Sequence, residues 1–254
     1  MIAAARAEML RRNLEPPKPK PNIYQTSFFQ FLTECIYTVD EGRAGEERKW
    51  PSGGEWNRIW RDIEFSLLTC SPLLIDKTRR VMASNVMCAF DLWIASGGRD
   101  ASTPEYPDGR WPSLARSSKN RLVLVQSRKL EDATGSVEFV RKIATMDRIL
   151  IEHKIYDAWP GYPVWKWNVS TRSALGTGSN GSRIQAIAQG AEQVRGPGCT
   201  LLHMEELSFW TEAKATVETA LPSLAPDGHL VAVTTPAAAT YAASVRRGQL
   251  IRRS

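Results

Sequence analysis

The chain has 254 residues, which is enough for one sizeable α/β domain with an appended segment, or for two small domains. Hydrophobic residues make up 43% and charged residues 24%, no apolar run approaches the ~20 residues that cross a bilayer, and the N-terminus lacks a signal-peptide core, so no membrane association is expected. The net charge of +6 permits a polyanionic partner, and four scattered cysteines with only three histidines argue against a structural zinc site.

The first quarter of the chain is expected to be mainly helical. Residues 1–22 form a basic arm that ends in a stiff linker rich in proline and lysine. A helical N-terminal segment is expected over residues 23–69. Within it, residues 27–39 have apolar side chains at helical spacing, a charged loop covers 40–55, and a further helix covers 55–68.

Short apolar strands alternate with helices over the main domain, residues 70–254. Strands are expected at 71–76, 121–127, 200–204 and 229–236, and helices at 84–95, 131–150, 211–221 and the end of the chain. A polar loop covers 97–113, and a hairpin at 174–189 turns at Asn180-Gly181. This alternation is typical of an α/β fold with a mostly parallel sheet and helices on both faces.

Two adjacent acids, Glu205 and Glu206, follow the strand at 200–204 in the sequence TLLHMEELSFW. A buried strand that ends in paired carboxylates can hold a metal with one and activate a water with the other, as in the Walker B motif of nucleoside triphosphatases. A strand followed by a solvated acidic turn is the alternative interpretation of the same residues.

A basic loop from Lys77 to Ser84 follows the first expected strand and leads into a long apolar helix. It supplies three cations and two hydroxyls at a helix N-terminus, which suits a triphosphate and Mg²⁺. The loop differs from the standard GxxxxGK[ST] sequence, because it has no glycine and Ala83 stands where lysine is expected. A third strand ends in Thr234-Thr235-Pro236, so three strands end in polar or charged residues.

In these segments the chain resembles the large terminase subunit of tailed phages, whose N-terminal domain is the ATPase of the motor that drives DNA into capsids. KTRRVMASN resembles that family's phosphate loop, a K-x-x-R-x-x-x-S pattern with a basic residue moved to its start. SRIQAIAQGAEQVRGPGCTLLHMEELSFW resembles the approach to its Walker B acids, and VAVTTPAAATY its coupling motif. The resemblance covers roughly residues 45–250 and implies a P-loop NTPase of the additional-strand, catalytic-glutamate (ASCE, RecA-like) type.

For the phosphate loop, the resemblance implies contacts with ATP and Mg²⁺. Lys77 would contact the β- and γ-phosphates, with Arg80 beside it as a second catalytic cation. Thr78 and Arg79 would line the same nucleotide site. Ser84 would hold Mg²⁺ through its hydroxyl.

For the other two motifs, the resemblance implies the catalytic and coupling residues. Glu205 would be the metal-associated acid and Glu206 the catalytic base. Thr234 and Thr235 would sense the γ-phosphate and couple hydrolysis to movement. Glu205 stands where that family usually has aspartate, which is one methylene shorter.

The resemblance also implies double-stranded DNA, a portal protein and the small terminase subunit as partners, in the cytoplasm of the host cell. The chain is expected to be a monomer in isolation and part of a homo-oligomeric ring when assembled. Large terminases normally continue into a ribonuclease-H-like nuclease domain, but no DNA-cleaving cluster of acids is visible, so no nuclease activity is expected. Two alternatives stay open: a helicase-like translocase, and a degenerate, non-hydrolysing ATPase fold that acts as a DNA-binding or assembly module.

Of three further residues, two allow two interpretations each. Arg195 could be a trans-acting finger or DNA contact, or a solvated loop arginine. Trp50 could hold the adenine base or pack at a domain edge. His203, within an apolar strand, is expected to be a core histidine with its hydrogen bonds satisfied.

Overall fold

The computed structural model describes residues 23–40, 46–48, 50, 56–77, 83–99, 118–146, 159, 161–170, 172–195, 198–237 and 240–246. Within these ranges, no helix is long and apolar enough to cross a membrane. The basic arm and linker (1–22), most of the basic loop (78–82) and most of the predicted polar loop (100–113) lie outside the described residues.

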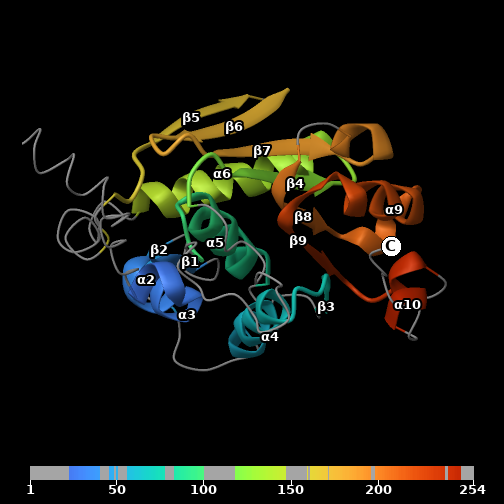
Figure 1. Ribbon diagram of the computed structural model, residues 1–254, viewed down its shortest axis with the longest axis horizontal. Coiled ribbons are helices and arrows are strands. Elements are labelled where there is room, and N and C mark those ends of the chain that lie inside the picture. Colours follow the sequence, from blue (N-terminus) through green and yellow to red (C-terminus); the bar gives the residue numbers. More distant parts are fainter. Residues whose placement is uncertain are drawn as a thin grey trace, which may run out of the picture.

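A sheet of seven strands forms the centre of the molecule, in the order β3-β9-β8-β4-β7-β6-β5 (Figure 1). The first five strands in this order are parallel, and β6 and β5 are antiparallel additions at one edge. The strands are β3 (Leu73–Asp76), β4 (Leu122–Ser127), β5 (Trp165–Ser170), β6 (Ser173–Gly178), β7 (Arg183–Ala188), β8 (Cys199–Glu205) and β9 (Leu224–Thr234). The predicted α/β fold with a mostly parallel sheet is confirmed.

Strand β9 lies between β3 and β8, although it is the last strand in sequence. Asp76 at the end of β3 pairs with Thr234, and Glu205 at the end of β8 pairs with Val233. This insertion matches the additional-strand type of fold that the resemblance in the sequence implies. Because the three strands are parallel, their carboxyl ends meet at one edge of the sheet.

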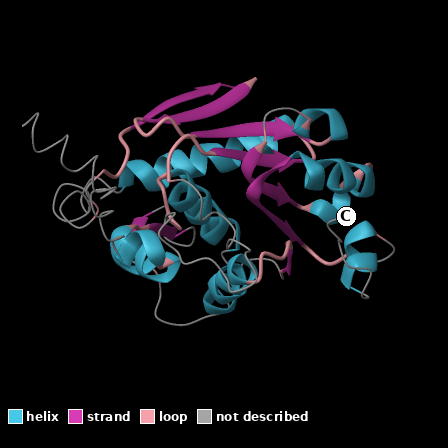
Figure 2. Cartoon of the chain, in the orientation of Figure 1, coloured by secondary structure: helices cyan, strands magenta, loops and turns pink. Residues whose placement is uncertain are grey.

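Helices cover both faces of the sheet (Figure 2). The main ones are α5 (Ala83–Ala95), α6 (Leu130–Met146) and α9 (Ala213–Ser223), and a short α10 (Tyr241–Arg246) follows the sheet. Side chains alternate between two hydrophobic cores, because successive residues of a strand point to opposite faces. Val123 and Leu201 lie in the core with α5 and α6, whereas Leu124 and Leu202 lie in the core with α9.

The N-terminal helical segment packs against α5. It comprises α2 (Ile23–Thr26), α3 (Phe28–Gln30), the π-helical turn η1 (Phe31–Cys35) and α4 (Trp56–Leu68). The ring of Phe28 lies 5.3 Å from that of Phe90, and the indole N–H of Trp93 donates to the carbonyl of Tyr24 at 2.6 Å. The Glu64 carboxylate accepts from the N–H of Phe28 at 3.1 Å, at the start of α3. The predicted boundary between residues 69 and 70 stays a prediction.

The predicted charged loop over residues 40–55 is wrong in part. A small antiparallel ribbon lies there, formed by β1 (Thr38–Asp40) and β2 (Glu46–Arg48), with Val39 opposite Glu47. So short a ribbon is defined by its backbone hydrogen bonds. It could not be predicted from this charged sequence, because apolar and polar residues do not alternate there.

The predicted hairpin is confirmed as β6 and β7, joined through Asn180-Gly181. Gly181 has φ +83°, and a Cβ there would clash with the side chain of Asn120, so both the turn and the packing require glycine. Strand β5 extends the hairpin, and sequence reasoning assigned nothing there. Gly176 of β6 leaves room for the ring of Trp167, because a Cβ at this position would overlap that ring.

Other predicted element starts differ by a few residues. The helix predicted at 131–150 begins at Leu130, and its predicted end lies outside the described residues; α9 begins at Ala213 instead of 211. Strand β9 begins five residues before the predicted 229, because the segment around Gly228 continues along β8 with a register irregularity between Cys199 and Leu201. Such an irregular start has no alternating pattern from which it could be predicted.

Candidate active site

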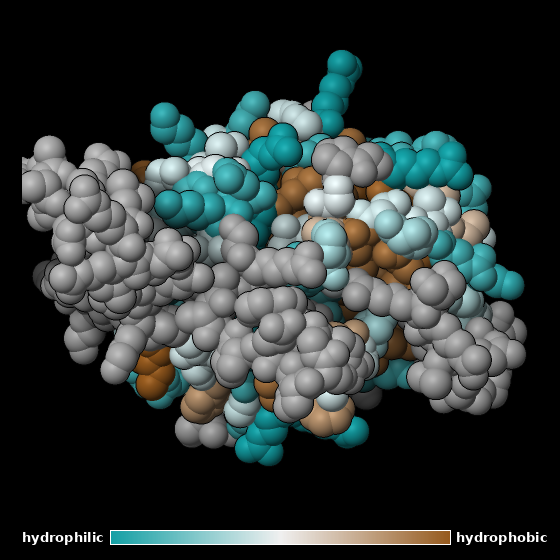
Figure 3. All heavy atoms as spheres, in the orientation of Figure 1, coloured by the Kyte–Doolittle hydropathy of each residue, from teal (hydrophilic) through white to brown (hydrophobic). Residues whose placement is uncertain are grey.

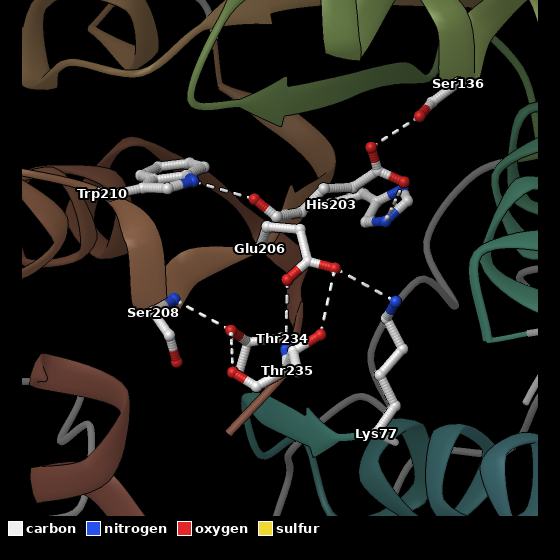
Figure 4. A network of polar contacts seen from close by, with 9 residues as sticks. Lys77, Ser136, His203, Glu206, Ser208, Trp210, Thr234 and Thr235 are labelled. Atoms are coloured by element: carbon white, nitrogen blue, oxygen red, sulfur yellow. Dashed lines mark hydrogen bonds and ion pairs between the residues drawn. The ribbon is translucent and has the colours of Figure 1, made fainter. Parts of the chain in front are cut away.

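Three strand ends meet at the carboxyl edge of the sheet, and each presents one of the predicted motifs (Figure 4). Lys77 follows β3, Glu206 follows β8, and Thr235 follows β9. The Nζ of Lys77 lies 3.1 Å from Oε1 of Glu206, with 15% and 38% of the two side chains exposed. The candidate phosphate-binding cation and the candidate base are therefore in direct contact, at a position open to solvent.

Glu206 has a left-handed backbone conformation, with φ 52° and ψ 42°. Few residues other than glycine adopt it, and it persists where surrounding contacts hold the residue in place. The carboxylate supplies such contacts: Oε2 accepts from the N–H of Thr235 at 3.1 Å, and Oε1 accepts from the Thr235 hydroxyl at 3.4 Å. The turn therefore directs Glu206 toward the end of β9 and toward Lys77.

Thr234 has a different role from its neighbour. Its side chain is buried, its Oγ1 accepts from the N–H of Ser208 at 2.9 Å, and its hydroxyl donates to the carbonyl of Thr235 at 3.2 Å. Ser208 lies in the 3₁₀ turn η5 (Leu207–Phe209) that follows Glu206. Thr234 thus ties the acid-bearing turn to β9, while Thr235 contacts the acid itself.

Glu205 points to the opposite side, toward α6. The hydroxyl of Ser136 in α6 donates to its Oε2 at 2.6 Å, and the indole N–H of Trp210 donates to its backbone carbonyl at 2.8 Å. Only 12% of the Glu205 side chain is exposed. The side chains of the two adjacent acids therefore point in different directions. Glu206 contacts residues at the ends of β3 and β9, and Glu205 contacts Ser136 of α6.

His203 lies on the same face of β8 as Glu205, because the two positions are two residues apart. Its Nδ1 lies 2.8 Å from Oδ2 of Asp91 in α5, and both side chains are fully buried. Burial lowers the pKa of His203, but Asp91 and, more weakly, Glu205 outweigh burial, so that the pKa is raised above its usual value. Its Nε2 lies 3.8 Å from Oε1 of Glu205 and has no hydrogen-bond partner among the described residues. The prediction of a core histidine is confirmed for burial and for Nδ1, and is wrong for Nε2.

Several predicted residues are not brought into this cluster. Thr78, Arg79 and Arg80 lie outside the described residues, and Ser84 is exposed at the second position of α5.

One of the two residues with open interpretations takes a structural place. Arg195 is 60% exposed and pairs with Glu192 at 2.7 Å, and both of its interpretations stay predictions. Trp50 is 7% exposed and belongs to the core with α5, which matches the packing alternative.

Sequence reasoning missed Asp91 and Ser136. Asp91 carried a signal, because a single acid within the apolar helix sequence SNVMCAFDLWIA needs a buried partner. His203, the single polar residue within the apolar run before Glu205, is the matching signal. Ser136 had none, since serine is common on the exposed side of a helix.

The oxygen donors of Ser84 and Glu205 are chemically suited to a magnesium ion. Mg²⁺ at nucleotide sites takes one or two protein oxygens and completes its shell with phosphates and waters. Ser84 offers a hydroxyl and Glu205 a carboxylate, and within the described ranges no group of three or more His, Cys, Asp or Glu could hold a metal by itself. Because Ser136 already donates to Glu205, this carboxylate suits acceptance from a metal-bound water.

Comparison with solved structures identifies the fold. The HK97 bacteriophage large terminase matches with a TM-score of 0.55 at 11% identity, over 88% of this chain and 42% of that chain. Weaker matches include a mutant ATPase domain of the Thermus phage P74-26 large terminase (TM-score 0.47, 10% identity, 77% of this chain and 69% of that chain). Another is the large terminase of a thermophilic bacteriophage in complex with ADP (TM-score 0.39, 13% identity, 71% and 37%).

No family model and no curated protein sequence matches the chain. At 11% identity the HK97 match shows the fold alone, and the chain spans 42% of the length of that terminase. The fold is that of a P-loop NTPase. More narrowly, it is the fold of phage large terminases, as the resemblance in the sequence predicted.

Proposed function

We propose that the chain is a Mg²⁺-dependent ATPase that powers translocation of viral double-stranded DNA into a capsid, as the ATPase part of a terminase large subunit. The observation that carries this proposal is the contact of Lys77, Glu206 and Thr235 at the ends of three neighbouring strands. A phosphate-binding cation, a candidate general base and a sensing hydroxyl in one place are what hydrolysis of a triphosphate requires. The terminase-like fold supports this choice of reaction by analogy.

ATP binding is expected to replace the contact between Lys77 and Glu206. The triphosphate has more negative charge than one carboxylate, so it would attract Lys77 and release Glu206. The freed carboxylate would accept a proton from the attacking water. The water oxygen bonds to the γ-phosphorus as the bond to the β–γ bridging oxygen breaks, and ADP and phosphate leave.

The other residues stabilise charge and report the state of the site. Lys77 and Arg80 would stabilise negative charge on the transferred phosphoryl oxygens. Ser84 and Glu205 would hold Mg²⁺, which adds positive charge at the phosphates when bound. Thr235 contacts Glu206, so a change in the position of Glu206 on hydrolysis would alter the end of β9. Thr234 would couple that change to the turn after β8, because it is hydrogen-bonded to Ser208.

The test of this function is Mg²⁺-dependent ATP turnover by the chain, together with nucleotide binding at equilibrium. Slow turnover that EDTA abolishes is expected, because a lone subunit lacks the arginine that a ring neighbour would contribute. A chain that binds no Mg²⁺-ATP even at millimolar concentration would instead be a degenerate assembly module. Strand separation of a duplex would favour the helicase-like translocase.

A positively charged face of the sheet supports DNA as the partner. Residues 158–191 contain Lys166, Arg172 and Arg183 and no carboxylate. Lys166 of β5 and Arg183 of β7 are register partners of Thr177 on β6, so they share one face and lie about 10 Å apart. Both are exposed, and hydrophilic residues gather along the upper rim of the molecule, where β5 and β6 lie (Figure 3). Two exposed cations on one face, in a segment of sequence without acids, suit the phosphates of a duplex.

Charge reversal on this face tests the DNA proposal. Lys166→Glu with Arg183→Glu is expected to weaken binding of the full chain to a short duplex at least tenfold, and to reduce the slope of log affinity against log salt by about 2. The matched control is Arg58→Glu with Lys214→Glu, two cations that are 88% and 70% exposed on α4 and α9. An equal loss of duplex affinity in both double variants would contradict the assignment of this face. If DNA binding vanishes only when residues 1–20 are removed, the basic arm is the DNA-binding segment instead.

The remaining partners follow from the same proposal. A packaging ATPase would act in the cytoplasm of the host cell, in a ring of identical subunits, with a portal protein and the small terminase subunit.

A further inference from the structure

A row of buried polar groups leads from the interior of the domain to Glu205. Asp91 of α5 bonds Nδ1 of His203 at 2.8 Å, and Nε2 of the same ring faces Oε1 of Glu205 at 3.8 Å. From the other side, Ser136 of α6 donates to Oε2 of Glu205 at 2.6 Å. Each carboxylate oxygen of Glu205 thus has one protein group directed at it.

Hydrophobic packing does not explain this row of buried polar groups. The register partners of His203 on the neighbouring strands are Val125 and Val231, and both belong to the buried core with α5. An apolar residue would suit this layer, since burying an imidazole and a carboxylate costs free energy that their mutual attraction repays only in part. In addition, Nε2 of His203 is a buried polar atom without a hydrogen-bond partner among the described residues, and it is aimed at Glu205.

We infer that His203 and Ser136 are positioning residues that hold the carboxylate of Glu205 for the Mg²⁺–nucleotide complex, with Asp91 orienting the imidazole. This inference rests on the proposed ATPase function. The need follows from the side chain of glutamate, which is longer than that of aspartate, the other acid that could stand here. One more methylene adds a rotatable bond, and contacts from both sides remove the freedom that it brings.

The same row of polar groups joins Glu205, the candidate metal-associated acid, to α5, the helix that follows the candidate phosphate loop. Asp91 lies seven residues after Ser84 on α5, which is about two helical turns. The bond between Asp91 and His203 therefore ties α5 to β8, two elements that are not neighbours in sequence. Ser84 and Glu205, the two candidate metal-holding residues, lie on the two elements that this bond joins.

The test separates the two nitrogens of His203. The measurement is equilibrium binding of a fluorescent, non-hydrolysable ATP analogue to the full chain as Mg²⁺ is titrated, with binding in EDTA recorded separately. His203→Asn retains an amide near Nδ1 and loses the group that faces Glu205. His203→Gln retains a donor near Nε2, so it is expected to restore part of the loss.

The expected result is a change in Mg²⁺ dependence alone. His203→Asn, Asp91→Asn and Ser136→Ala should each raise the Mg²⁺ concentration for half-maximal binding by roughly 10–100-fold, with binding in EDTA unchanged. The matched control is His229→Asn, which alters another buried histidine of a central strand; its Nε2 lies 3.1 Å from the Ser66 hydroxyl. This control should lower the melting temperature and retain the parent's Mg²⁺ dependence.

Parent-like Mg²⁺ dependence in a folded His203→Asn variant would overturn the inference. If that variant does not fold, the same result in Ser136→Ala, which alters only a half-buried helix position, would overturn it equally. A parent chain that binds Mg²⁺-nucleotide beside unaffected variants would refute the inference and leave the proposed function standing. A parent chain without Mg²⁺-dependent binding would refute both.

Discussion

Replacement of Glu206 by glutamine is expected to lower ATP turnover by about 10²–10⁴-fold and to retain nucleotide binding. Glutamine keeps the size and one carbonyl acceptor, so the contact with the Thr235 N–H can persist, but the amide does not accept a proton from water. It also removes the negative charge that pairs with Lys77 at 3.1 Å. Since that carboxylate competes with the phosphates for Lys77, we expect ATP affinity to increase severalfold.

The measurement combines steady-state turnover with equilibrium binding of ATP. Glu218→Gln is a suitable control, because Glu218 is a 62% exposed acid on α9 that pairs with Lys214 at 3.8 Å, away from the strand ends. It should match the parent in both assays. Unchanged turnover in the Glu206→Gln variant would remove this residue from the mechanism, and weaker ATP binding would contradict the competition between the carboxylate and the phosphates.

Replacement of Lys77 by methionine is expected to abolish both ATP binding and turnover. Methionine has a similar length without the charge, so the loss would report the ammonium group and not the packing of the stem. The side chain is only 15% exposed, and its ammonium group contacts the carboxylate of Glu206, which follows β8. A cation at this position can reach phosphates bound at the sheet edge.

Lys214→Met serves as the control for this substitution, because it removes a 70% exposed lysine on α9. Its binding and turnover should equal those of the parent. ATP binding by Lys77→Met within threefold of the parent would show that another cation, such as Arg80, holds the phosphates. That outcome would preserve an ATPase but reassign its phosphate loop.

Much of the fold was predictable because its signals are local. Apolar runs with turn residues between them predicted four of the strands, and Asn180-Gly181 predicted the hairpin, since a left-handed turn favours these residue types. The three polar strand ends were also visible, because Lys77, Glu206 and Thr235 each stand one polar residue after an apolar run. Strand β5 and the β1–β2 ribbon were not, since pairing with a neighbouring strand decides them more than their own pattern does.

The sequence by itself determined which residues stand at the ends of parallel strands, because strand polarity follows from the alternation of strands and helices. Only the tertiary structure decided how these ends combine. The insertion of β9 between β3 and β8 brings Lys77 to Glu206, and a left-handed turn separates the directions of Glu205 and Glu206. The physical reason is that strand order and side-chain contacts across helices depend on long-range packing. Asp91 and Ser136 therefore contact residues of β8 only because α5 and α6 pack on its face.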